Sequence, residues 1–137
     1  MNAEEFRSLA LALPDAEERA HMDHPDFRVN GRIFASLGYP DAAFAMVKLY
    51  PAQQKDFVAL HPTMFAPVKG AWGEKGCTNV RLTSATKGPV SEALHAAWRN
   101  AAVRTEIRRI EKEKGVEKPG RPRRAKSRAA LPVRETS

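Results

Sequence analysis

The chain has 137 residues and a formal net charge of +7, from 23 Lys and Arg against 16 Asp and Glu. This length suits one domain with a moderate core and a tail, and excludes two full domains. The sequence has no run of about eighteen apolar residues, which excludes a transmembrane helix, and its single cysteine, Cys77, excludes an internal disulfide. An acidic start, with no basic leader, and a lone cysteine lead us to expect a cytoplasmic protein.

The first segment is expected to be an amphipathic helix followed by a strand. Its apolar stripe, at helical spacing, consists of Phe6, Leu9, Ala10 and Leu13. Asn2 and Glu5 have the spacing of a capping box, and Pro14 ends the helix. Residues 16–22 form a plausible first strand.

A β-hairpin is predicted around Asn30-Gly31, a pair typical of type I′ turns. The expected register places Val29 opposite Arg32 and Arg28 opposite Ile33. It also places Phe27 opposite Phe34. Both faces of the hairpin carry apolar residues, so the pattern leaves open which face is buried.

A third strand, a short helix and an extended connector are expected next. The strand covers residues 43–49, and the helix starts at Pro51 and stops at His61-Pro62. Phe57, Val58 and Leu60 are the expected buried side of that helix. Residues 64–68 form the connector.

The stretch from Gly70 to Leu82 is predicted to be a loop that leads into a strand. Gly70, Gly73 and Gly76 recur at every third position, which favours a loop with close backbone approach or positive φ. Trp72 is expected to plug this loop against the body. The alternating residues from Asn79 to Thr83 predict a half-buried strand.

A long helix and a basic tail complete the chain. The helix opens at Pro89, and its buried stripe consists of Val90, Leu94, Ala97, Trp98 and Ala101. From Val103 the stripe slips to another face, which predicts a bend or projecting last turns. Residues 116–137 have no periodicity and are expected to be a disordered tail on a domain of residues 1–115. That tail carries +5 of the net charge.

Several of these motifs, in this order, resemble the MmcQ/YjbR family over roughly residues 1–103. They are His24-Pro25-Asp26-Phe27-Arg28-Val29, Gly31-Arg32-Ile33-Phe34-Ala35, Met46-Val47-Lys48-Leu49, Gly70-Ala71-Trp72-Gly73, Thr78-Asn79-Val80-Arg81-Leu82 and Ala97-Trp98-Arg99. The resemblance implies an α+β fold, an antiparallel sheet backed by N-terminal and C-terminal helices, of the kind shared with CyaY and frataxin. It also implies DNA binding through a "double wing" arrangement. Tyr50 replaces a helix-capping threonine common in the family, and the extension after residue 103 departs from it.

Two sets of basic residues are candidates for binding duplex DNA. On the body these are Arg28, Arg32, Lys48, Lys69, Lys75 and Arg81, which belong to the expected wings and loop and could contact phosphates. In the tail Arg121, Arg123 and Arg124 surround a Gly-Arg-Pro core like that of an AT-hook, although Pro119 stands where the motif has arginine. A solvated body surface and a tail with general affinity for polyanions are the alternatives.

The sequence gives less support to metal binding, to nucleophilic catalysis and to a phosphate-binding loop. His21, Asp23 and His24 could ligate a metal, but the sequence offers few further ligands, and we expect no metal and no cofactor. Cys77 and His95 lack a third group that would orient them as nucleophile and base. The glycines do not match a phosphate-binding loop.

We therefore expect a non-enzymatic, monomeric, cytoplasmic DNA-binding protein without membrane attachment. The body would supply a wing-like surface, and the tail would supply charge-driven affinity. The alternative is an adaptor that binds a protein or a small ligand on the sheet face near Trp72. A continuous basic face would favour DNA, and an apolar cleft would favour the adaptor.

Overall fold

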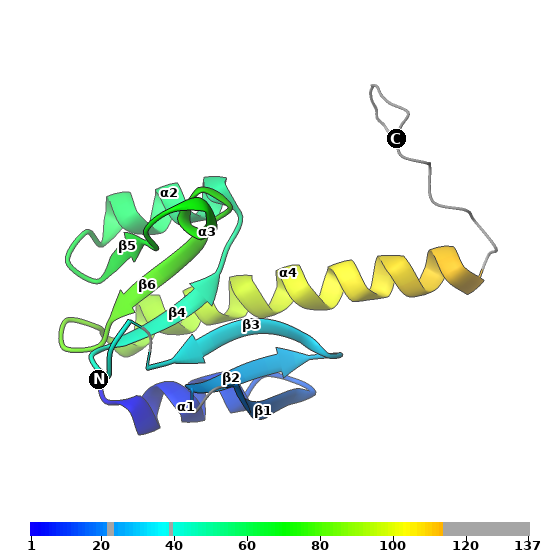
Figure 1. Cartoon of the computed structure of the whole chain (residues 1–137), viewed down its shortest axis with the longest axis horizontal. Coiled ribbons are helices and arrows are strands. Elements are labelled where there is room, and N and C mark those ends of the chain that lie inside the picture. Colours follow the sequence, from blue (N-terminus) through cyan, green and yellow to red (C-terminus); the bar gives the residue numbers. More distant parts are fainter. Residues whose placement is uncertain (22–23, 39, 114–137) are drawn as a thin grey trace. The chain divides into compact units, whose positions relative to one another are not determined.

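The computed structural model describes residues 1–21, 24–38 and 40–113 (Figure 1). Residues 1–105 form one compact unit, and residues 106–137 form a second, of which only 106–113 are described. The expected domain boundary after residue 115 therefore lies outside the described residues. The elements in chain order are α1 (Ala3–Leu11), β1 (Ala16–His21), β2 (His24–Val29), β3 (Arg32–Leu37), β4 (Phe44–Lys48), α2 (Pro51–Leu60), β5 (Phe65–Pro67), α3 (Ala71–Glu74), β6 (Cys77–Arg81) and α4 (Lys87–Glu113).

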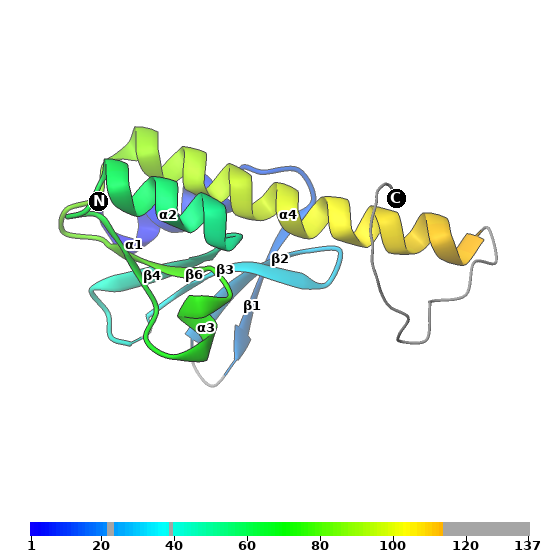
Figure 2. The same ribbon diagram turned by 90° about the horizontal axis from the view of Figure 1, so that it is seen from above.

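The fold is α+β, as predicted, and is built on one six-stranded sheet. Its strand order is β1-β2-β3-β4-β6-β5, and every neighbouring pair is antiparallel. Figure 2 shows α1, α2 and α4 on one side of this sheet and α3 on the other. One face of the sheet is thereby covered by helices, as expected for a sheet with a single buried face.

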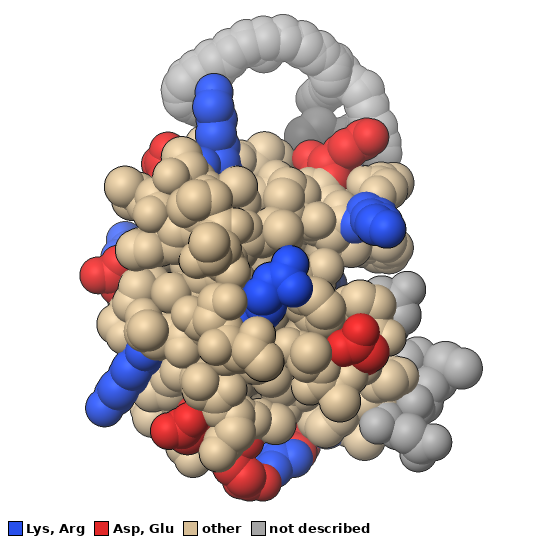
Figure 3. Space-filling model, turned by 90° about the vertical axis from the view of Figure 1, so that its left-hand side faces the viewer, with Lys and Arg blue, Asp and Glu red and all other residues tan. Residues whose placement is uncertain are grey.

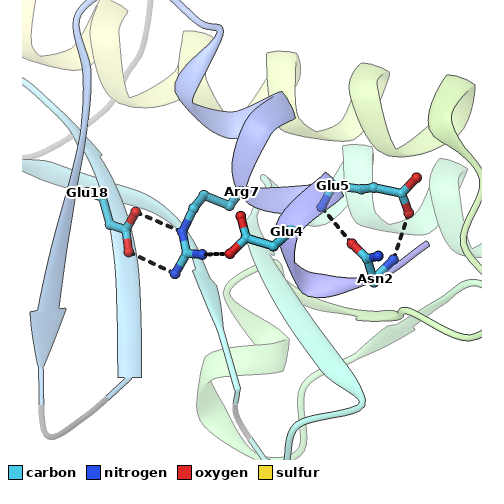
Figure 4. A network of polar contacts seen from close by, with 5 residues as sticks. All are labelled: Asn2, Glu4, Glu5, Arg7 and Glu18. Carbon is cyan, nitrogen blue, oxygen red and sulfur yellow. Dashed lines mark hydrogen bonds and ion pairs between the residues drawn. The ribbon is translucent and has the colours of Figure 1, made fainter.

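Helix α1 begins with the predicted capping box. The Asn2 side chain accepts a hydrogen bond from the Glu5 backbone N–H, and the Glu5 carboxylate accepts one from the Asn2 N–H, both at 2.8 Å (Figure 4). Arg7, one turn further, pairs with Glu4 on its own helix and with Glu18 on β1. The helix is thus started by its cap and tied to the edge of the sheet by an ion pair.

The β2–β3 hairpin has the predicted turn but a different register beyond it. Asn30 and Gly31 both have positive φ, 53° and 82°, as a type I′ turn requires. Val29 lies opposite Arg32 and Arg28 opposite Ile33, as expected. Phe27, however, pairs with Ala35 and not with Phe34, because a β-bulge inserts one extra residue into β3.

The bulge lets the helix-covered face take more apolar side chains than strict alternation allows. Phe27, Phe34 and Ala35 are all fully buried. The Phe6 ring of α1 packs on Phe27 with ring centroids 6.2 Å apart. The same core contains Val47, Phe65 and Val80 from other strands of the sheet and Val90 and Leu94 from α4.

Two other expectations about local structure were wrong, and the expected extended connector proved to be part of the sheet. Leu60 was expected on the buried side of α2 but is 73% exposed. Of the three expected residues only Phe57 and Val58 pack against the core. The connector contains β5, an edge strand that pairs with β6. The glycine-rich stretch includes the four-residue helix α3 between two positive-φ glycines, Gly70 and Gly76.

Candidate functional site

A pocket opens where strands β3 and β4 separate. Their paired residues run from Ala35–Val47 to Leu37–Ala45, so the start of β3 and the end of β4 extend beyond the paired segment. Figure 1 shows the two strands diverging at this end of the sheet. The pocket has a volume of about 440 Å³ and is lined by the β2–β3 hairpin, the end of β4, the α3 segment and α4. This volume lies within the range of small-ligand sites, ~300–1,000 Å³.

Positive charge is concentrated in this pocket. Five cations line it, namely Arg28, Arg32, Lys48, Lys75 and Arg104, and no described acidic residue does. The body as a whole is almost neutral, since residues 1–105 hold twelve Lys and Arg and eleven Asp and Glu. The clustering is therefore a feature of the fold and not of composition, and it produces a local potential that attracts anions.

Elsewhere on the body the two signs of charge are mixed. Figure 3 shows the end of the molecule opposite the β2–β3 turn, where Lys and Arg side chains lie singly among Asp and Glu. On that face positive and negative side chains are interspersed (Figure 3), whereas the described lining of the pocket carries positive charge alone.

One of the five cations is already held by an internal partner. Arg28 donates to the Asp26 carboxylate from Nε at 2.8 Å and from Nη2 at 3.1 Å. Asp26 is only 3% exposed, so this bidentate pair compensates a buried charge. The hydrogen bond to Asp26 is the main reason why the pKa of Arg28 is raised. The charge of Arg28 is therefore largely compensated by Asp26, and its main role is to form part of the pocket wall.

The other four cations have no such partner. Within the part of the chain that the structure describes, no salt bridge joins Arg32, Lys48, Lys75 or Arg104 to a carboxylate. Gathering like charges without counter-charges costs free energy in the folded protein. An anionic ligand would remove that cost.

Trp72 stands at the pocket and is exposed. The expectation that it plugs the loop against the body was wrong, because its side chain lies on α3 and is 61% accessible to solvent. The ammonium groups of Lys48 and Lys75 lie 5.8 Å and 5.4 Å from its ring centroid, within cation–π range. The indole and two of the cations therefore form one surface.

The backbone around Trp72 is held by close contacts that only glycine permits. A Cβ on Gly73 would lie 1.7 Å from the Val68 carbonyl oxygen. Gly76 has a φ of +111°, and a Cβ on it would lie 2.0 Å from the Leu49 carbonyl oxygen. The sequence-based expectation of close approach and positive φ in this stretch is thus confirmed.

The side chain of Gln54 adds a clamp from helix α2. Its Nε2 donates to the Gly73 carbonyl at 3.0 Å and to the Cys77 carbonyl at 2.9 Å. These bonds tie α2 to the residue that follows Trp72 and to the start of β6, on either side of Lys75. The exposed indole therefore stands on a fixed support.

Sequence reasoning missed the contributions of α4 and of Tyr50. Ala97, Asn100, Ala101 and Arg104 line the pocket at positions i, i+3, i+4 and i+7 of one helix face. That spacing was visible in the sequence, but it was read only as a buried stripe that slips. Tyr50, interpreted only as a helix cap, is 49% exposed and also lines the pocket.

The remaining predicted DNA-binding residues lie elsewhere. Lys69 is exposed before α3 and does not line the pocket. Arg81, on β6, lies over the Phe44 ring at 5.3 Å. Arg121, Arg123 and Arg124 lie outside the described residues.

Cys77 and His95, the candidates for catalysis, lie in different surroundings. Cys77 lines the pocket, and burial raises the pKa of its thiol despite the opposing effect of Lys48 and Lys75. His95 instead stacks on the Trp98 ring. Among the described residues no cluster of three or more His, Cys, Asp or Glu could hold a metal ion. Asp23 and the His21 side chain are not described.

Over the same described part of the chain, no helix is long and apolar enough to span a membrane.

Comparisons with known proteins identify the family. No curated protein matches the chain. A solved structure, the Deinococcus radiodurans protein DR2400 with a DUF419 domain, is similar to it with a TM-score of 0.65. The match covers 90% of this chain and 96% of that one at 19% identity, which shows a shared fold. The YjbR family model matches residues 11–100. All six strands, α3 and most of the pocket lining lie inside that segment, and the chain belongs to the YjbR family.

Proposed function

We propose that this protein binds DNA, and that its body does so by holding phosphates in the basic pocket. The observation that carries the proposal is the group of five cations, with no described acid, around one concavity of an otherwise balanced body. Affinity for nucleic acid rests mainly on neutralising phosphates with clustered Lys and Arg. Four of those cations were selected from the sequence for this role.

The aromatic residues of the pocket strengthen the proposal. Trp72 and Tyr50 are both exposed and both line it. A basic groove with accessible aromatic side chains is typical of proteins that bind nucleic acid without strong sequence preference. An acidic peptide would also be attracted by the charge, but it would not need the aromatic surface.

The basic tail completes the proposed function. Its seven Lys and Arg, which include Arg121, Arg123 and Arg124, would add sequence-independent affinity for duplex DNA. The Gly-Arg-Pro core would favour A·T-rich minor grooves if it acts like an AT-hook. In this role the protein is a monomeric binding protein and not an enzyme, and it works in the cytoplasm.

The test is a salt series of DNA binding by the full-length chain, followed by fluorescence anisotropy. Lys48→Ala/Lys75→Ala removes two pocket charges, and Lys55→Ala/Lys87→Ala removes two exposed charges outside the pocket. If the pocket holds phosphates, the first variant loses affinity and its log–log salt slope falls by about 2, whereas the second changes little. Equal effects of the two variants would show that only net charge matters.

A third variant separates the pocket from the tail. Arg121→Ala/Arg123→Ala/Arg124→Ala keeps the pocket and should lower affinity most on A·T-rich duplexes if the tail enters the minor groove. Loss of all binding in this variant would assign DNA binding to the tail alone. Absence of binding by the unaltered chain near physiological salt would reject the proposed function.

A small-ligand site is the second candidate, because the pocket is concave and has the volume of a ligand pocket. Its ligand would be anionic and planar, to match the cations and Trp72. A small anion that saturates the pocket while no oligonucleotide binds would favour this adaptor role.

A further inference from the structure

We infer that the pocket takes an unpaired nucleotide of a DNA strand, with its base stacked on Trp72 and its phosphate held by Lys48 and Lys75. This inference rests on the proposed function and specifies which form of DNA the body recognises. It is carried by one exposed indole that lines a small cavity and has two ammonium groups within cation–π range of its ring.

Trp72 has the properties of a stacking platform. Its side chain is 61% exposed, and among the described residues no hydrogen bond is formed by its indole N–H. Trp98, the other tryptophan, is partly buried and donates from Nε1 to the Pro14 carbonyl at 2.9 Å. An exposed tryptophan on a rigid support is expected to gain from a flat partner, and every base offers a π-face.

The two lysines lie where the phosphate of a stacked nucleotide would lie. Lys48 reaches the indole from the end of β4, and Lys75 reaches it from the residue after α3. A nucleotide joins a planar base to an anion through one sugar, so a base on the ring brings its phosphate close to these ammonium groups. Arg32 and Arg104, on other walls of the same pocket, are placed for the neighbouring phosphates of a continuing strand.

The cavity discriminates between an unpaired strand and a closed duplex. In a duplex both faces of each base are covered by the adjacent base pairs, so stacking on Trp72 requires a base to leave the helix, at a cost of unstacking. A volume of about 440 Å³ is in the range of small-ligand sites and can take one nucleotide, whereas a closed duplex can present only its backbone phosphates to the pocket. The body is therefore expected to prefer single strands, gaps and frayed ends.

The test compares a short oligothymidylate with a blunt duplex of equal phosphate number, at one salt concentration, on the full-length chain. Anisotropy should show tighter binding of the single strand. Trp72→Ala should weaken that binding about tenfold or more and leave duplex binding nearly unchanged, and Trp72→Phe should restore most of it. Leu60→Ala is the matched control, because it removes another exposed apolar side chain outside the pocket.

Fluorescence provides a direct readout of stacking. In Trp98→Phe the emission comes from Trp72 alone, and the oligothymidylate should quench it. If that variant does not fold, quenching in the unaltered chain that disappears in Trp72→Ala gives the same information. Free thymidine monophosphate should quench only at far higher concentration than the oligomer, because it lacks the neighbouring phosphates.

The outcomes separate this inference from the proposed function. Equal loss of single-strand and duplex binding in Trp72→Ala, or binding without quenching, would overturn the stacking site and leave phosphate binding by the pocket intact. Equal affinity for the free nucleotide and the oligomer would overturn the assignment to a strand. Absence of binding to either oligonucleotide would reject the proposed function itself.

Discussion

Arginine and lysine have opposite roles in two regions of this protein. Beside α1, Arg7 is paired with Glu4 and Glu18, and Arg19 pairs with Glu17 on the same strand. At the pocket, four cations face one cavity without a described carboxylate partner. The α1 region uses charge to hold its elements together, whereas the pocket accumulates charge that the fold itself does not need. The two regions therefore differ in whether charge is compensated within the fold.

The two regions are also held by different forces, and the largest expected effect concerns the pocket backbone. Gly76→Ala would place a Cβ 2.0 Å from the Leu49 carbonyl oxygen at a φ of +111°. We expect the free energy of unfolding to fall by at least about 2 kcal/mol, measured by urea denaturation. Gly88→Ala, where a Cβ meets no atom within 4 Å on a helix, should be neutral or stabilising. Equal effects of the two substitutions would contradict the close-approach argument.

The clamp of Gln54 should have the next largest effect. Gln54→Ala removes two hydrogen bonds to the carbonyls of Gly73 and Cys77 and should cost about 1–2 kcal/mol in thermal or urea unfolding. It should also weaken oligonucleotide binding, because α3 then holds Trp72 less firmly. Lys55→Ala, an exposed substitution on the same helix, should change neither quantity. Normal binding by the Gln54 variant would show that the clamp serves stability alone.

Removing one cation from each region tests the comparison directly. Arg7→Ala breaks the ion pairs to Glu4 and Glu18 and should lower stability slightly without changing DNA affinity. Lys75→Ala should do the reverse, with stability unchanged or slightly higher, because like charges separate, and with weaker binding. Calorimetry measures the stability of both variants, and anisotropy measures their affinity for DNA. Parallel behaviour would remove the distinction between the two regions.

The smallest effect concerns the Cys77 thiol. Burial raises its pKa, while Lys48 and Lys75 act in the opposite direction. The midpoint of its reaction with a disulfide reagent across pH should therefore lie above the ordinary value of about 8.5, and Lys48→Ala/Lys75→Ala should move it higher still. Because the folded state disfavours the thiolate, stability should also decrease as the pH rises past that ordinary value. A reaction midpoint below that ordinary value would contradict the argument that burial raises the pKa of the Cys77 thiol.

Much of the fold could be predicted because its signals are local. The capping box of Asn2 and Glu5 and the Asn30-Gly31 turn depend on residues a few positions apart, and both formed as expected. The apolar stripe of α4 from Val90 to Ala101 likewise follows from helical spacing. Four of the cations predicted from the sequence, which flank turns and strand ends, line the pocket together.

The missed features depend on contacts between distant segments. The bulge at Phe34 arises where the hairpin packs on α1, and local alternation carries no trace of it. Arg104 and Tyr50 enter the pocket because β4 turns away from β3 and leaves a face of α4 accessible. Trp72 was expected inside because large rings usually are, but the backbone approach of Gly73 to Val68 turns the segment so that the indole faces outward.

The sequence by itself indicated most of the elements, the family and four of the five cations that line the pocket. Hydrophobic period, turn chemistry and charge are properties of short segments, and they can be read along the chain. Tertiary structure alone decided that five cations and an exposed indole would share one cavity. That arrangement is set by where two strands cease to pair, which depends on the packing of the whole sheet against its helices.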